Sequence, residues 1–189
     1  MTESWRCFVA VPIEETLRRD LASAVEGWMA RPDLAGLRWS DPTAWHVTLA
    51  FLGAVDPDQI NALREAVGAA AVASQPGVLR TGGVGGFPSA RHARVAWYGI
   101  ADPDGHLSTI ADRLRTALGL DASASLRPHL TLGRARSEPV DLSAWRAAAD
   151  EPSGVLEVSG LELMRSHLGR GPARYEMIST TPLGAPTHA

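Results

Sequence analysis

The chain has 189 residues, of which 45% are hydrophobic and 21% charged, as expected for one soluble globular domain with a substantial core. A formal net charge of −3 and a pI near 6.1 argue against a broad surface for duplex DNA or RNA, which would need an excess of basic residues. One cysteine excludes an internal disulfide and a multi-cysteine metal site, and without a signal-like start or a long apolar run we expect a cytoplasmic protein with no membrane partner.

Hydrophobic periodicity predicts the elements of the first half of the chain. Strands are expected near 5–11, 37–40 and 46–52, and helices over 13–29 and from Asp56 or Asp58 to about 73. Cys7 lies within the first apolar run, so we interpret it as a small buried hydrophobe. The glycine cluster at 82–86 lacks the pattern of a phosphate-binding loop and favours a bend or bulge between strands.

The second half gives a weaker echo of the same order. Strands are expected near 94–100, 129–133, 155–164 and 174–180, with helices over 104–118 and 141–149. Mixed strands and helices without strict alternation indicate an α+β fold, and the echo suggests two similar lobes. We therefore predict a single bilobal domain over 1–184, followed by a flexible tail over 185–189.

One four-residue pattern occurs twice, once in each half. The two copies are His46-Val47-Thr48-Leu49 and His129-Leu130-Thr131-Leu132. Because successive side chains in a strand alternate faces, each copy places an imidazole and a hydroxyl on one face and an apolar pair on the other. Two such strands facing a common cleft would bring two imidazoles and two hydroxyls into one small volume.

Two imidazoles suit acid–base chemistry on a phosphate ester. A neutral histidine takes a proton from the attacking water, and an imidazolium gives one to the leaving oxygen. Both forms exist near neutrality because the unperturbed pKa of histidine is about 6.5. Thr48 and Thr131 can donate hydrogen bonds to the phosphate oxygens, and Arg134 can add a guanidinium. The residues alone therefore predict a two-histidine site for a small anionic ester.

Other interpretations of these histidines fit less well. A lone His-x-Thr in a strand is most often an exposed or satisfied residue, but two copies with matching apolar flanks are not expected by chance. A zinc site lacks spaced carboxylate or cysteine partners, and no G-x-S-x-G motif indicates a serine hydrolase. We expect no metal and no cofactor.

Four stretches of the chain together resemble the 2H phosphoesterase superfamily. The fuller match is to the bacterial and archaeal RNA 2',3'-cyclic phosphodiesterases, once named 2'-5' RNA ligases. These stretches are residues 6–11, 46–53 and 127–134, and Ser166-His167-Leu168 with Gly171 and Tyr175.

The resemblance implies a bilobal, pseudo-two-fold fold with two antiparallel sheets flanking a central cleft and helices outside. It implies hydrolysis of 2',3'-cyclic phosphate RNA ends to 2'-phosphates, with weak reverse ligation. By the same resemblance His46 is the proton donor and His129 the acceptor. Thr48, Thr131 and Arg134 correspond to phosphate contacts, and Phe8 and Tyr175 to cleft-lining aromatics for a base or ribose. His167 stands where an arginine is common, which leaves its role open.

Two alternatives remain open at this level. The same site would also suit a small cyclic nucleotide or an ADP-ribose cyclic phosphate. A non-catalytic RNA- or nucleotide-binding module is the second, although binding alone does not require paired imidazoles. In each case we expect a monomer whose partner is RNA or a small nucleotide, and not a DNA duplex.

Overall fold

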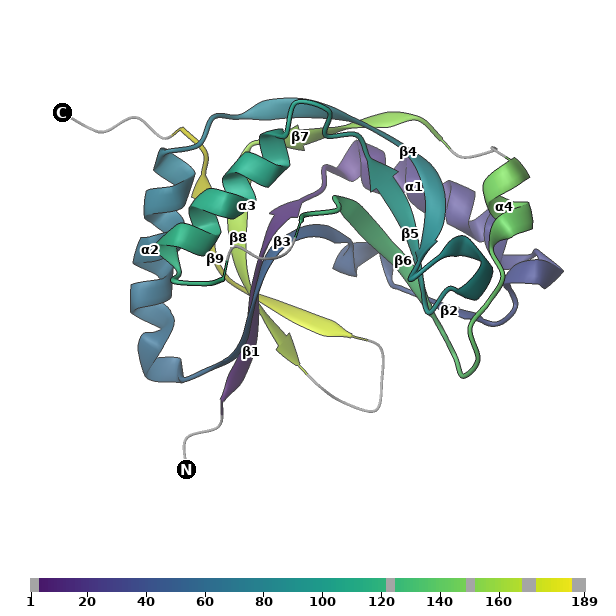
Figure 1. Ribbon diagram of the computed structural model, residues 1–189, viewed down its shortest axis with the longest axis horizontal. Coiled ribbons are helices and arrows are strands. Elements are labelled where there is room, and N and C mark those ends of the chain that lie inside the picture. The colour runs from purple at the N-terminus through teal and green to yellow at the C-terminus, as the bar shows by residue number, and fades with distance from the viewer. Residues whose placement is uncertain (1–3, 122–124, 149–151, 168–172, 185–189) are drawn as a thin grey trace.

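A single curled antiparallel sheet organises the molecule, as seen in the computed structural model (Figure 1). The structure describes residues 4–121, 125–148, 152–167 and 173–184. Helices α2 and α3 lie side by side at one end of the sheet, and α1 and α4 lie at the other. The core is formed between these helices and one face of the strands.

The elements follow the chain in a mixed order. The strands are β1 (Trp5–Pro12), β2 (Leu37–Trp39), β3 (His46–Val55), β4 (Gly77–Phe87), β5 (Val95–Ile100), β6 (His129–Ala135), β7 (Gly154–Val158), β8 (Gly160–His167) and β9 (Arg174–Pro182). The helices are α1 (Glu15–Met29), α2 (Ile60–Val72), α3 (His106–Ala117) and α4 (Ser143–Ala148). The α+β class is therefore confirmed.

The expectation of two separate sheets has to be corrected. The described strands form one sheet in the order β7-β4-β5-β6-β3-β1-β8-β9, with β2 added beside β6. The two halves of this sheet, each with one of the His-x-Thr-Leu strands, join where β3 meets β6. This seam between β3 and β6 has a single register pair, Val47 opposite Leu130. The two halves therefore belong to one continuous sheet but are joined by very little strand pairing.

The helices cross over between the halves. Helix α1 follows β1 in the chain but contacts β7 in the other half, and α4 contacts β4. Helix α3 follows β5 yet packs on β3, beside α2, which contacts β8 and β9. The buried positions of α1 are Leu17, Leu21, Val25 and Trp28, and this helical spacing gives one apolar stripe for the core.

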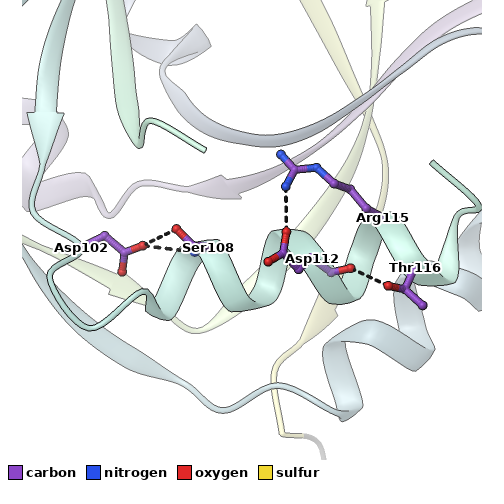
Figure 2. Close-up of polar contacts among 5 residues, drawn as sticks. All are labelled: Asp102, Ser108, Asp112, Arg115 and Thr116. Atoms are coloured by element: carbon purple, nitrogen blue, oxygen red, sulfur yellow. Dashed lines mark hydrogen bonds and ion pairs between the residues drawn. The ribbon is translucent and has the colours of Figure 1, made fainter. Parts of the chain in front are cut away.

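Most expected elements are found with boundaries shifted by a few residues. The segment expected as one strand over 155–164 is two strands, β7 and β8. The third long helix starts at His106 rather than 104, and its N-cap residue is Gly105, which has a φ of 68°. The Asp102 carboxylate accepts hydrogen bonds from the backbone N–H groups of Leu107 and Ser108 in its first turn. Figure 2 shows the contact between Asp102 and Ser108. The expected bulge is present: Gly82 and Gly83 lie where the β4–β5 register shifts, and Gly83 has a φ of 78°.

The burial of Cys7, the character of the helices and the C-terminal tail were also predicted from the sequence. Cys7 is 3% exposed and burial raises the pKa of its thiol, in agreement with a buried hydrophobe. No helix in the described part of the chain is long and apolar enough to cross a membrane. The expected flexible tail over 185–189 lies outside the described residues.

Candidate active site

The two motif strands meet at the seam of the sheet. His46 is the first residue of β3 and His129 the first of β6, and the antiparallel pair Val47–Leu130 lies between them. Both side chains of that pair are fully buried in the core. Continuing the register one residue each way sets His46 beside Thr131 and Thr48 beside His129, on the opposite face.

That opposite face forms the floor of a cavity of about 820 Å³. Its size is in the range of nucleotide-sized ligand sites. The cavity brings together all seven residues that the sequence predicted for the site, namely Phe8, His46, Thr48, His129, Thr131, Arg134 and Tyr175. They come from β1, β3, β6 and β9, which are far apart in the chain.

Each histidine is anchored in the same way. Nδ1 of His46 lies 2.8 Å from the Ala44 carbonyl oxygen, and Nδ1 of His129 lies 2.6 Å from that of Arg127. A carbonyl oxygen only accepts, so Nδ1 carries the proton in both rings. In each neutral ring Nε2 therefore holds the free lone pair, available to a ligand in the cavity.

Burial keeps both imidazoles toward their neutral form. Desolvation lowers the pKa of His46 from its usual value, the bond to Ala44 opposes this, and the charge of His129 adds to the lowering. Desolvation also lowers the pKa of His129, against the bond to Arg127, and the guanidiniums of Arg134 and Arg127 lower it further. The pKa of His46 is thus lowered by a charge on His129, and the pKa of His129 by the charges of Arg134 and Arg127.

Aromatic rings support both imidazoles. The Phe8 ring stacks on His46 with centroids 4.7 Å apart, and Tyr175 meets the same imidazole edge-on at 5.0 Å. Phe8 is only 3% exposed, so it mainly fixes His46 and offers little surface to a ligand. Phe87, at the end of β4, packs edge-on against His129 at 4.9 Å. Sequence reasoning missed Phe87, because nothing in its local pattern points to β6.

Each motif strand bulges at the motif leucine. Thr48 lies opposite Ala10 while Ala50 lies opposite Val9, so Leu49 is the extra residue in β3. Similarly, Leu132 is the extra residue in β6, between the partners of Trp97 and Ala96. A bulge reverses the alternation of side chains beyond it. The residue five positions after each histidine consequently returns to the cavity face.

These returning residues are Arg134 in β6 and Phe51 in β3, and both line the cavity. Strict alternation would place them on the face away from the histidines. Arg134 was a sequence candidate, and the bulge explains how it reaches the site. Phe51 was missed, since only the register of β1 against β3 reveals its direction.

The cavity is positively charged although the protein is acidic. Five described arginines line it, against two aspartates. Arg38 of β2 lies directly opposite Arg134 in the β2–β6 ladder, a like-charge pair that is unfavourable without an anion nearby. Arg115 reaches the cavity from α3 and is held by Asp112 at 2.9 Å (Figure 2). Such a lining attracts small anions.

His167 and possible metal ligands remain to be placed. Nε2 of His167 lies 2.8 Å from the Glu176 carboxylate, and His167 does not line the cavity. Across the described ranges, no group of three or more His, Cys, Asp and Glu side chains could hold a metal ion. The described cavity thus offers imidazoles, hydroxyls and guanidiniums.

Comparison with known proteins shows which family this chain resembles in sequence. A family model described as LigT like phosphoesterase matches residues 11–97. An RNA 2',3'-cyclic phosphodiesterase of Archaeoglobus fulgidus is 29% identical over 167 residues, 86% of this chain and 92% of the relative. Another, of Geobacillus stearothermophilus, is 32% identical over 188 residues, 95% of this chain and 58% of the relative. This chain is a LigT-like 2H phosphoesterase.

Solved structures agree with that assignment. The structure of E. coli LigT complexed with NADP+ has a TM-score of 0.73 at 26% identity, covering 96% of this LigT-like phosphoesterase and 99% of that chain. Other structures of the same E. coli protein are complexes with phosphate and with ATP. The match over nearly the full length extends to both halves of the curled sheet.

Proposed function

We propose that this LigT-like phosphoesterase hydrolyses the 2',3'-cyclic phosphate at RNA ends to a 2'-phosphate, with His46 and His129 as the acid–base pair. The observation that carries the proposal is the matched anchoring of the two imidazoles across the seam: each Nδ1 lies against a backbone carbonyl oxygen, and both rings line one cavity. The relatives named RNA 2',3'-cyclic phosphodiesterases supply the substrate class.

The reaction follows from which ring holds a proton. Water attacks phosphorus and passes a proton to Nε2 of neutral His129. The bond between phosphorus and O3' breaks, and the imidazolium of His46 protonates O3'. The products are a 2'-phosphate monoester and a free 3'-hydroxyl, with the proton now on His129. Exchange with solvent then restores the starting protonation of both rings.

The surroundings of the two rings favour this division of roles. Two guanidiniums, those of Arg134 and Arg127, lower the pKa of His129 beyond the effect of burial and so favour the neutral base. Burial and the charge of His129 lower the pKa of His46 as well, but its imidazole lies against the π face of Phe8, where the negative quadrupole favours a cationic ring. His46 therefore serves as acid and His129 as base.

Hydroxyls and arginines stabilise the charge that develops on the phosphate. Thr48 and Thr131 face the cavity on either side of the seam, where their O–H groups can donate to the non-bridging oxygens. The like-charge pair Arg38 and Arg134 gains a counter-ion when the phosphate is bound. No step in this scheme requires a metal ion.

The test is hydrolysis of a short RNA that ends in a 2',3'-cyclic phosphate, in the presence of EDTA, with the 2'- and 3'-phosphate products separated by chromatography. We expect only the 2'-phosphate, and a loss of about 10²- to 10⁴-fold in kcat for His46→Ala and for His129→Ala. Far-ultraviolet circular dichroism and thermal melts of both variants control for folding. Full activity in either folded variant would refute the proposal.

Two other outcomes would redirect the assignment. E. coli LigT has been solved with NADP+. A higher kcat/KM for a small cyclic nucleotide or an ADP-ribose cyclic phosphate than for RNA would therefore assign the site to small molecules. Tight binding of the RNA without turnover would indicate a binding module. Reverse 2'-5' ligation is secondary in this scheme, because water far outnumbers ribose hydroxyls in dilute solution.

A further inference from the structure

On the His46 side of the cavity a large aromatic ring is left uncovered. Phe51 is 75% exposed and lines the cavity, with its ring centroid 6.3 Å from that of Phe8. The other exposed large hydrophobic residues of the described chain do not line this cavity; they are Met29, Val72, Val78, Val155 and Met177. Phe51 thus offers a free ring surface next to the proposed reaction centre.

The bulge at Leu49 is what turns this ring toward the cavity. The equivalent bulge at Leu132 turns Arg134 the same way, so Phe51 and Arg134 hold matching places in the two halves. One half therefore presents a cation beside its histidine, and the other presents an aromatic ring. Phe87 does not offer a comparable free ring surface on the His129 side, because its ring already contacts His129, Trp97 and the Arg127 guanidinium.

A cation lies on the same side as Phe51. Arg6 and Phe8 share one face of β1, and Arg6 is exposed and lines the cavity. No carboxylate among the described residues lies within ion-pair distance of Arg6. Its register partner in β8 is Ser166, which also lines the cavity. A stacking ring, a guanidinium and a hydroxyl therefore occur together.

We propose that Phe51 and Arg6 form a subsite for the nucleotide that precedes the cyclic-phosphate end. The base of that nucleotide stacks on Phe51, and Arg6 pairs with the internucleotide phosphate, with Ser166 as a second donor. The inference rests on the proposed function and narrows it, because the preferred substrate becomes an RNA chain of two or more nucleotides rather than a mononucleotide.

The chemistry of the substrate fixes where the chain can continue. In a 2',3'-cyclic phosphate both O2' and O3' of the last ribose are bonded to phosphorus, so the chain leaves only through O5'. The preceding nucleotide must then lie to one side of the two imidazoles. Three of the cavity arginines belong to the His129 side: Arg134 lies in β6, Arg38 lies opposite it in β2, and Arg127 precedes β6. The uncovered ring of Phe51 lies in β3, on the His46 side.

The test compares kcat/KM for cytidine 2',3'-cyclic phosphate with that for a dinucleotide ending in the same group. We expect the wild-type protein to prefer the dinucleotide, and Phe51→Ala to reduce this preference about tenfold, since base stacking on an aromatic ring contributes on that scale. Phe51→Trp should retain the preference. Arg6→Gln should reduce it too, and should weaken its dependence on salt concentration.

Val78→Ala is the matched control, because Val78 is an exposed apolar residue of β4 outside the cavity. An unchanged preference in Phe51→Ala would overturn the inference. A parallel loss on both substrates would also overturn it, since Phe51 would then stack the terminal base. Absence of wild-type turnover on the mononucleotide and the dinucleotide alike would instead be a failure of the proposed function itself.

Discussion

Val47 and Leu130 face each other across the seam between β3 and β6, in the single register pair that joins the two halves of the described sheet. Each is followed by a motif threonine and preceded by a motif histidine, and each is fully buried. The packing of this apolar pair therefore sets the spacing of the two imidazoles on the other face. A substitution in this buried pair should therefore change the distance between the two imidazoles in the cavity.

Shortening Leu130 should affect stability and activity together. Leu130→Ala removes a fully buried side chain and should lower the free energy of unfolding by about 2–5 kcal/mol. It should also lower kcat, because the strands that carry His46 and His129 lose their contact. Urea denaturation and steady-state kinetics measure the two effects. The matched control is Leu163→Ala in β8, equally buried but away from the seam, which should destabilise with a smaller loss of kcat.

The titration of His46 should depend on His129. Burial is the main reason why the pKa of His46 is lowered, and the charge of His129 adds to it. Replacing His129 with glutamine removes that charge, so the pKa of His46 should rise in the variant. A pH titration followed by NMR of the imidazole signals measures it. A pKa of His46 that stays the same, or falls, would contradict electrostatic coupling between the two rings.

The pH dependence of kcat/KM should be bell-shaped and shifted to the acid side. Because the pKa of each histidine is lowered, both rings are mostly neutral at pH 7 and the acid His46 carries its proton in few molecules. Activity should thus rise as the pH falls below 7, until the base His129 becomes protonated. The maximum should lie below about pH 6.5, the usual pKa of histidine. An optimum well above that value would contradict the scheme.

The motif threonines should contribute to kcat through their hydroxyls. Thr48→Val and Thr131→Val keep the shape of the side chain but remove the donor, and each should lower kcat by about 10²-fold if the hydroxyl meets developing charge. Thr48→Ser and Thr131→Ser keep the donor and should retain most activity. If the valine variants are as active as the serine variants, the threonines serve only the packing of the strands.

The cross-strand arginine pair should determine affinity for the phosphate group. Arg134→Met and Arg38→Met should each raise the inhibition constant of inorganic phosphate, and the double variant should show coupling, because the two residues are direct neighbours in the β2–β6 ladder. Arg19→Met, on the exposed side of α1, is a control that should leave inhibition unchanged. Additive effects of the two cavity variants would mean that one anion does not bridge both side chains.

The sequence by itself determined the elements and the pair of histidines. The 3.6-residue spacing of Leu17, Leu21 and Val25 identifies α1 because a helix buries one stripe, and local periodicity contains that information. The repeated His-x-Thr-Leu identifies the two motif strands for a similar reason, since alternation places histidine and threonine on one face. The α+β class and the family follow from these local signals.

Only the tertiary structure decided how the halves join and which other residues reach the cavity. Whether two lobes form two sheets or one depends on a single long-range pair, Val47 with Leu130, which no local pattern contains. The direction of Phe51 depends on a bulge at Leu49, and a bulge is defined only against the partner strand β1. Phe87 and Arg38 enter through the neighbours of β6, by pairings distant in the sequence. Alternation within a strand determines which of its residues share a face, whereas the pairing of strands distant in the sequence determines which residues of different strands come into contact.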